Sequence, residues 1–434
     1  MNVEIGLYGI LALCILLLVR VPIAIAMVVV SFLGIGFMIG WEPALGTLAA
    51  TPYHFVASWT LSAIPMFLLM GFISYHSGIT TGLFDTARSL MRWLPGNLAI
   101  SSILACSGFA AVCGSSLACA AAMGRIAIPE MVAAGYRANF ACGSVAAGGT
   151  IGALIPPSIL MIVYCVFTET SVTQVFVGGI SVGIATALGY CIVVLLVTWL
   201  RPDIVPRRAG GRDLLPIRQA IFGIWPVLAL VALVFGGLFG GFFTATEAGA
   251  AGAMGAFLLA AATRRLTRKI VWDSLQETLM TCSALFIVGV GAVMFTRFLS
   301  LSGVTGFLAG MVNGADLSFT ELMFLVVLIY LILGMFMEPF GAMLVTLPIL
   351  MPIFAAEQIS MVWFGVLAVK LLEIGMITPP VGMNVFIIRN VASDYASLMG
   401  IYAGVALFLV SDIVVVALMI LSPEWVLYLP GILR

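Results

Sequence analysis

The stretch GGTIGALIPPSI, Gly148 to Ile159, and its echo EIGMITPPVGMN, Glu373 to Asn384, decide the fold of this chain. Each lies in apolar sequence and contains a glycine, three further residues and then two adjacent prolines. Proline removes a backbone donor and disfavours helix at the preceding residue, while glycine permits unusual dihedrals, so a helix is predicted to unwind at both places. Unwound backbone in a bilayer is tolerated where it lines a cavity. Matched broken segments in two halves of a chain are therefore typical of a transporter's binding site.

The composition indicates a polytopic membrane protein. Of the 434 residues, 63% are hydrophobic and only 8% are charged, whereas soluble domains are roughly half apolar. The net charge of zero gives no electrostatic indication of a nucleic-acid partner. Because the segment before Arg20 lacks a basic start and a cleavage site, we interpret it as a first span. The eight cysteines form no CxxC pair and are interpreted as small packing residues.

Apolar runs divide the chain into two halves. A run of about 20 residues is needed to cross a hydrocarbon core of about 30 Å. In the first half, 1–200, the predicted segments are 5–19, 21–40, 60–82, 97–124, 139–166 and 175–199. In the second half, 219–434, they are 219–240, 243–263, 275–297, 319–356, 363–388 and 397–421. The arginine-rich segment 201–218 between the halves is predicted to be a cytoplasmic linker.

One segment in each half is predicted to enter and leave the membrane on the same side. The segment 97–124 is roughly 42 Å of helix, too short for two crossings, so a re-entrant hairpin fits better. Its tip is expected at Cys113 to Ser116, where small residues let two backbones turn. The counterpart 319–356 turns around Met337 to Gly341. It is longer, so two ordinary spans remain an alternative there.

Counting the crossings predicts the relation between the halves. Three crossings, a hairpin and two crossings give an odd number of passes, so the second half must be inverted relative to the first. The predicted fold is therefore an all-α polytopic membrane protein with two inverted-topology repeats, each with a hairpin and a broken helix. Placing the basic loops inside puts both termini on the periplasmic side.

The breaks suit both an anion and a cation. Each proline pair fits the first turn of a new half-helix, whose amides and positive dipole end attract an anion. Carbonyls freed at the breaks can coordinate a small cation. The hairpin tips are expected to form a second wall. The candidate substrate-binding residues at these tips and breaks are Ser115, Ser116, Thr150, Gly341, Pro379 and Asn384.

Charged residues in apolar segments are costly and are functional candidates. Besides Glu247, the sequence places Glu338, Lys370, Glu373 and Asp412 in such segments. Lys370 and Glu373 are three positions apart on one helix, so we favour a pair between them over a contact with substrate. Glu338 is placed to orient the second hairpin tip. Asp412 has two open roles, pairing across helices or contacting a partner subunit.

The chain resembles the large membrane subunit, of the DctM type, of tripartite ATP-independent periplasmic (TRAP) transporters. The resemblance covers nearly the whole sequence. It is carried by the order and spacing of IPMFLLMGF at Ile64 to Phe72, the CGSS tip, Pro129-Glu130-Met131, AAGGTIGALIPPSI, FTATEAGA at Phe243 to Ala250, and EIGMITPPVGMNVF.

This resemblance implies an elevator mechanism coupled to sodium ions, with no other cofactor and no enzymatic activity. It also implies two partners in the bacterial inner membrane system: a small membrane subunit of about four spans, expected as a separate chain, and a periplasmic protein that delivers an organic acid. Transferred residue by residue, the first sodium site would comprise Ser107, Gly108, Gly152, Ile155 and Ser158. The second would comprise Gly334, Gly375, Thr378 and Val381.

Three other functions fit the sequence less well. A stand-alone sodium-coupled dicarboxylate symporter has the same hairpin architecture, but such carriers typically show Ser-Asn-Thr triplets that this chain lacks. An intramembrane serine protease needs a base beside its nucleophile, and both histidines, His54 and His76, are far from the CGSS turn in the sequence. A primary pump would need a phosphate-binding loop that the sequence does not contain.

Overall fold

The computed structural model describes residues 2–206, 216–315 and 317–432, and within these ranges every regular element is a helix. Eight of the described helices are long and apolar enough to cross a membrane, or nine if the bent pair α11 and α12 counts as one span. The prediction of an all-α polytopic protein is confirmed. Half of the linker 201–218, the residues 207–215 with Arg207, Arg208 and Arg212, lies outside the described residues.

The first half begins with two apolar helices and ends with a long one. Its helices are α1 (Val3–Leu18), α2 (Ile23–Ile39), α3 (Trp41–Val56), α4 (Ala63–His76), α5 (Gly82–Leu90), α6 (Asn97–Cys113), α7 (Ser116–Ala133), α8 (Ala138–Thr150), α9 (Ile159–Thr168) and α10 (Val172–Leu200). Short 3-10 turns at Trp59–Ser62, Ile79–Thr81 and Ile151–Ala153 join some of them. The predicted break therefore lies between α8 and α9.

The second half repeats this order of elements. After α11 (Ile217–Gly223) come α12 (Trp225–Phe239), α13 (Ala245–Ala262), α14 (Arg268–Ser302), α15 (Val304–Gly314), α16 (Phe319–Phe336), α17 (Pro339–Ala356), α18 (Met361–Gly375), α19 (Met383–Val391), α20 (Leu398–Leu421) and α21 (Glu424–Ile432). The hairpins α6–α7 and α16–α17 correspond, as do the broken helices α8–α9 and α18–α19. The second break lies between Gly375 and Met383.

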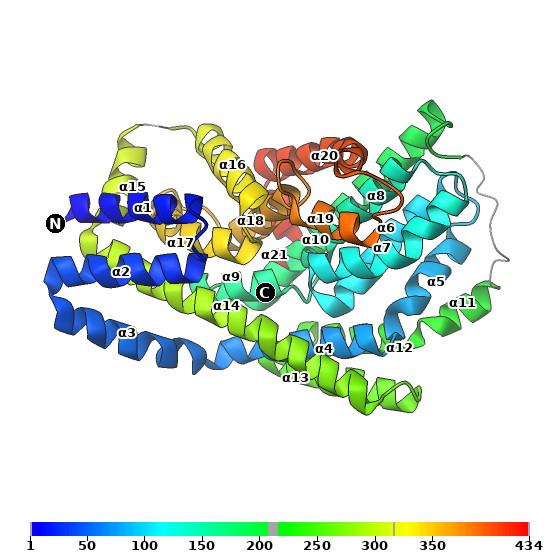
Figure 1. The fold of residues 1–434 in the computed structure, drawn as a ribbon, viewed down its shortest axis with the longest axis horizontal. Helices are drawn as coiled ribbons and strands as arrows, with labels where there is room; N and C mark the ends of the chain where they lie inside the picture. Colours follow the sequence, from blue (N-terminus) through cyan, green and yellow to red (C-terminus); the bar gives the residue numbers. More distant parts are fainter. Residues whose placement is uncertain (1, 207–215, 316, 433–434) are drawn as a thin grey trace.

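Helices of each half of the chain pack against helices of the other half. Helix α2 packs against α14 of the other half, and α13 packs against α4. Figure 1 shows α14 running diagonally across the elongated molecule, beneath α2 at one end and beside α13 and α4 at the other. The second helix of each hairpin also contacts the second segment of the broken helix in the opposite half of the chain. Helix α7 contacts α19, and α17 contacts α9. This reciprocal packing is expected of two repeats related by a two-fold axis.

Several helices extend beyond the predicted segments or lie between them. The first hairpin is predicted to end at 124, but α7 continues to Ala133 through Arg125 and Glu130. Helix α14 begins at Arg268 rather than 275, and α3 fills the gap between predicted segments 21–40 and 60–82. These parts carry polar residues, so an apolar window misses helical turns that continue beyond the hydrocarbon core.

Candidate functional site

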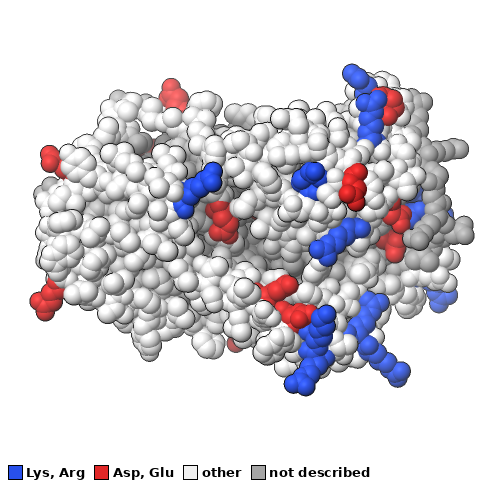
Figure 2. Space-filling model, viewed as in Figure 1, with Lys and Arg blue, Asp and Glu red and all other residues white. Residues whose placement is uncertain are grey.

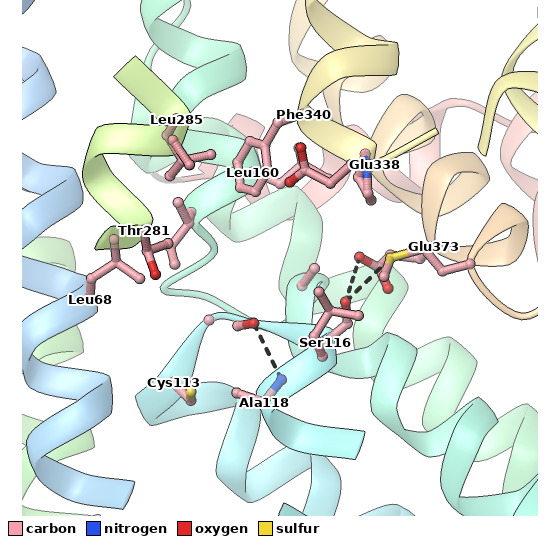
Figure 3. Close-up of a pocket in the computed structure, with 18 of the residues that line it drawn as sticks. Leu68, Cys113, Ser116, Ala118, Leu160, Thr281, Leu285, Glu338, Phe340 and Glu373 are labelled. Carbon is pink, nitrogen blue, oxygen red and sulfur yellow. Dashed lines mark hydrogen bonds between the residues drawn. The ribbon is translucent and has the colours of Figure 1, made fainter. Parts of the chain in front are cut away.

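A cavity of about 380 Å³ lies between the two hairpin tips. Both hairpin tips, the first break and the end of α18 line one side, and α4 and α14 line the other (Figure 3). Because Ser115 and Ser116 of the first tip share this cavity with Glu338, Pro339 and Phe340 of the second, both helix pairs end at the same place. This arrangement favours a re-entrant hairpin over two ordinary spans for α16–α17.

The first hairpin tip fits closely against the first break. Gly114 has a φ of +65°, and a Cβ there would clash with the carbonyl of Pro157. A Cβ on Gly152 would lie 2.9 Å from the carbonyl oxygen of Ser115. The Ser115 side chain accepts a hydrogen bond from the amide of Ala118, which caps α7. Glycine is therefore required on both sides of this contact because the backbones touch.

The second hairpin makes a similar contact with the second broken helix. A Cβ on Gly375 would lie 2.6 Å from the Cα of Gly334, so α16 and α18 touch backbone to backbone. After this contact the chain leaves the helix, and the Thr378 hydroxyl donates to the carbonyl of Ile374 at 2.6 Å. The amide of Asn384 donates to the carbonyl of Met376 at 3.0 Å, which closes the break.

Three helices begin at the cavity. The first turns of α7, α9 and α17 contribute Leu117 and Ala118, Ile159 and Leu160, and Pro339 and Phe340 to its lining. First-turn amides have no acceptor within their own helix and carry the positive end of its dipole. Three such ends at one cavity make it attractive to an anion, although no Lys, Arg or His belongs to the described lining.

Two carboxylates line the same cavity. Glu373 is 1% exposed, and its Oε1 accepts a hydrogen bond from the Ser116 hydroxyl at 3.1 Å. Its other oxygen, Oε2, has no hydrogen-bond partner among the described residues. Glu338, at the tip of the other hairpin, also lines this cavity (Figure 3). The cavity thus combines helix N-termini with acidic side chains.

The predicted pair between Lys370 and Glu373 is wrong. Lys370 lies 2.6 Å from Oδ1 of Asp412, and both side chains are fully buried. Lys370 also donates to the Thr186 hydroxyl at 3.0 Å, and the Tyr190 hydroxyl donates to Asp412 at 2.8 Å. Asp412 therefore takes the first of its two open roles, pairing across helices. Helical spacing indicated a local pair, but tertiary packing places Lys370 beside α10 and α20.

Four of the six predicted substrate-binding residues do not line the cavity. Thr150 lies 3.3 Å from the Tyr190 hydroxyl, at the edge of the buried ion pair. Gly341 packs against Ile23 of α2, and Pro379 is exposed. The Asn384 amide is buried without a hydrogen-bond partner among the described residues. Only Ser115 and Ser116 line the cavity as expected.

Some of the proposed residues of the first sodium site lie together. Gly152 and Ser158 lie beside the hairpin tip, where the Ser158 side chain accepts a hydrogen bond from the amide of Met161. Ile155 contacts Gly183 of α10. Ser107 and Gly108 lie further along α6. The Ser107 hydroxyl donates to the carbonyl of Ile103, and Gly108 packs against Leu83 of α5.

The residues proposed for the second sodium site follow one another around the second break. Gly334 and Gly375 are in direct contact, and Thr378 follows Gly375 within the break. The Val381 carbonyl accepts a hydrogen bond from the Tyr402 hydroxyl at 2.6 Å. Both sodium sites remain predictions.

The sequence does not predict the wall formed by α4 and α14. It contributes Leu68 and Phe72 from α4, and Thr281, Leu285 and Val288 from α14. In a chain that is 63% hydrophobic, apolar residues carry no signal that separates a cavity wall from a lipid-facing surface. One turn from this wall, His76 of α4 pairs with Glu277 of α14 at 3.2 Å.

Known proteins resemble this chain over most of its length. Residues 10–425 match the family model described as "Tripartite ATP-independent periplasmic transporter, DctM component". The C4-dicarboxylate TRAP transporter large permease protein DctM of Pseudomonas aeruginosa is 36% identical over 347 residues, which cover 79% of each chain. The sialic acid TRAP transporter large permease protein SiaM of Vibrio cholerae is 30% identical over 377 residues, which cover 86% of this chain and 87% of the relative. Both relatives are named as permeases, not enzymes.

The fold is also similar to that of a solved transporter. The crystal structure of the YdaH transporter of Alcanivorax borkumensis aligns with a TM-score of 0.61, covering 88% of this chain and 89% of that one. The two sequences are 13% identical, so the likeness shows a shared fold alone.

Proposed function

Since this chain belongs to the DctM family of tripartite ATP-independent periplasmic transporters, we propose that it takes up an organic acid in symport with sodium ions. It is the large permease subunit of a secondary transporter and a polytopic protein of the inner membrane. The observation that carries the proposed substrate class is the convergence of three helix N-termini, those of α7, α9 and α17, on one cavity. Such ends favour a carboxylate.

The family is tripartite, so a small membrane subunit and a periplasmic binding protein accompany this chain. We propose that the small subunit has about four spans. The relatives are named for different acids, a C4-dicarboxylate in one and sialic acid in the other. The acid carried by this chain is therefore proposed only as a carboxylate.

Sodium coupling is proposed from the two breaks. Each break interrupts the backbone hydrogen bonds of a helix, beside a hairpin that is in backbone contact with it. Carbonyl oxygens released in this way are suitable ligands for a small hard cation. Binding through carbonyls depends on backbone shape, which the glycine contacts at Gly152 and Gly375 maintain.

The elevator mechanism is proposed from the two sides of the cavity. Hairpins and broken helices form one side and α4 and α14 the other. The α4–α14 side contributes mainly apolar side chains, such as Leu68, Phe72 and Leu285. Because an apolar surface makes few directional bonds, the hairpin side is expected to slide along it with its substrate.

Uptake of a mixed pool of labelled organic acids into proteoliposomes tests this function. The vesicles would contain this chain and its small subunit, with an inward sodium or proton gradient, with and without the binding protein. We expect uptake only with both sodium and the binding protein, and the retained acid would identify the substrate. Sodium-driven uptake without the binding protein would instead support a stand-alone symporter, and uptake driven only by protons would contradict sodium coupling.

The proposed orientation places both termini and the loop between α9 and α10 in the periplasm. Figure 2 supports it, because the visible Lys and Arg side chains lie mainly over the end of the molecule where α5, α7 and α11 lie in Figure 1. Basic residues concentrate on the cytoplasmic side of membrane proteins.

Cysteine labelling in intact cells tests this orientation. Ser171 is exposed between α9 and α10, and Lys269 is exposed at the start of α14. In a background lacking the exposed Cys14 and the half-buried Cys191, Ser171→Cys should react with an impermeant maleimide and Lys269→Cys should not. The reverse labelling pattern would overturn the proposed orientation.

A further inference from the structure

We propose that Glu373 contacts the transported acid directly, accepting through Oε2 a hydrogen bond from an O–H or N–H group on the carbon next to the acid's carboxylate. This inference rests on the proposed function. It adds a requirement that the helix N-termini do not impose, namely a donor group close to the carboxylate.

The first observation is the incomplete bonding of Glu373. This side chain is 1% exposed at the end of α18, yet only Oε1 has a hydrogen-bond partner, the Ser116 hydroxyl at 3.1 Å (Figure 3). Oε2 has none among the described residues. Buried polar atoms are nearly always paired, because leaving one unpaired costs free energy. Since Glu373 lines the cavity, a bound molecule is the available partner.

The nearby cation does not fulfil this role. Lys370 lies one turn earlier on α18, but it donates to Asp412 at 2.6 Å and to Thr186 at 3.0 Å. A metal ion would need several hard ligands. Within the described part of the chain, no group of three or more His, Cys, Asp and Glu side chains is arranged to hold one, and the proposed sodium sites bind their ion through backbone carbonyls of the breaks rather than through this side chain. A cavity of about 380 Å³ also suits a small organic molecule better than a single ion.

The position of Ser116 fixes where the donor must lie on the substrate. Ser116 is the first residue of α7, so its backbone amide is among those that face an anion at this helix end. Its side chain is bonded to Glu373. An acid held at the start of α7 therefore has its carboxylate beside Glu373, and a group on the adjacent carbon is the one that can reach Oε2. A 2-hydroxy or a 2-ammonium acid meets this condition, and the unsubstituted acid does not.

Glu338 provides a matched control. It is the other carboxylate of the cavity, and it lies at the opposite hairpin tip. Removing it takes one carboxyl group out of the same cavity, as removing Glu373 does. A general electrostatic effect would therefore appear in both variants, whereas a specific hydrogen bond would be lost only with Glu373.

The test compares three four-carbon acids: succinate, 2-hydroxysuccinate and 2-ammoniosuccinate. Binding to the purified complex of this chain and its small subunit is measured by thermal stabilisation in sodium-containing buffer, without the binding protein, so that selectivity belongs to the membrane subunits. We expect at least one substituted acid to bind about tenfold or more tightly than succinate, because a buried acceptor is left unpaired by the analogue without a donor. Comparing 2-hydroxysuccinate with 2-ammoniosuccinate then shows whether the preferred donor is an O–H or an N–H group.

The same series is repeated with Glu373→Met and Glu338→Met. Glu373→Met should bring the ratio between substituted and unsubstituted acid close to one, while Glu338→Met should leave it unchanged. Equal binding of all three acids to the wild type, or an unchanged ratio in Glu373→Met, would overturn the assignment of Glu373. If Glu373→Met does not fold, the wild-type binding ratios still test the proposal, because equal binding of the three acids overturns it. Failure of the complex to bind any organic acid would instead overturn the proposed function, and this inference with it.

Discussion

Replacing Asp412 by alanine is expected to lower the free energy of unfolding by about 3–5 kcal/mol, because it leaves the charge of Lys370 buried without its partner. Both side chains are fully buried, and their charged atoms are 2.6 Å apart. Tyr190 and Thr186 of α10 complete the network, and the substitution leaves the Tyr190 hydroxyl with Thr150, at 3.3 Å, in place of the carboxylate. Thermal or denaturant unfolding of the purified complex would measure the loss.

Two control variants separate the buried charge from other effects. The double variant Lys370→Met with Asp412→Leu removes both charges and should recover most of the lost stability, since well-packed apolar replacements of buried pairs are often neutral. Asp203→Ala breaks the surface ion pair between Asp203 and Arg137, whose side chains are 51% and 62% exposed, respectively. This change should lower the free energy of unfolding by at most about 1 kcal/mol. A double variant as unstable as Asp412→Ala would show that the hydroxyl partners, and not the charge, dominate.

Replacing Gly375 by valine is expected to reduce uptake by at least about tenfold and to destabilise the protein by about 1–3 kcal/mol, as overpacking does in cores. The first side-chain atom would lie 2.6 Å from the backbone of Gly334, and backbone cannot rotate away as a side chain can. Helix α16 must therefore separate from α18, which displaces the second hairpin from the proposed sodium site. Sodium-driven uptake and melting temperature would measure the two effects.

The matched control for this change is Gly236→Ala in α12. A Cβ at that position would meet nothing within 4 Å. The substitution should leave uptake unchanged and keep or slightly raise stability, because alanine is the better helix former. If Gly375→Val transported normally, the backbone contact between α16 and α18 would not be needed for function.

The sequence predicted those parts of the site that depend on backbone chemistry. Glycine and proline have local effects, so the breaks after Gly152 and Gly375 and the hairpin tip at Ser115 were found where the structure has them. The contact between Ser116 and Glu373 joins residues 257 positions apart, and no local pattern indicates it. Helical spacing predicts the wrong partner for Lys370, because it describes neighbours on one helix, whereas its partner Asp412 is on another.

The exchange of helices between the halves also has a consequence for the order of events during biosynthesis. Helix α2 ends at Ile39, and its packing partner α14 begins at Arg268. At about 5–20 residues per second, a ribosome needs on the order of 10–45 seconds to synthesise the roughly 230 residues between them. During that interval α2 is inserted without its final neighbour, so we expect the insertion machinery, a chaperone or the small subunit to cover its exposed face until the second half arrives.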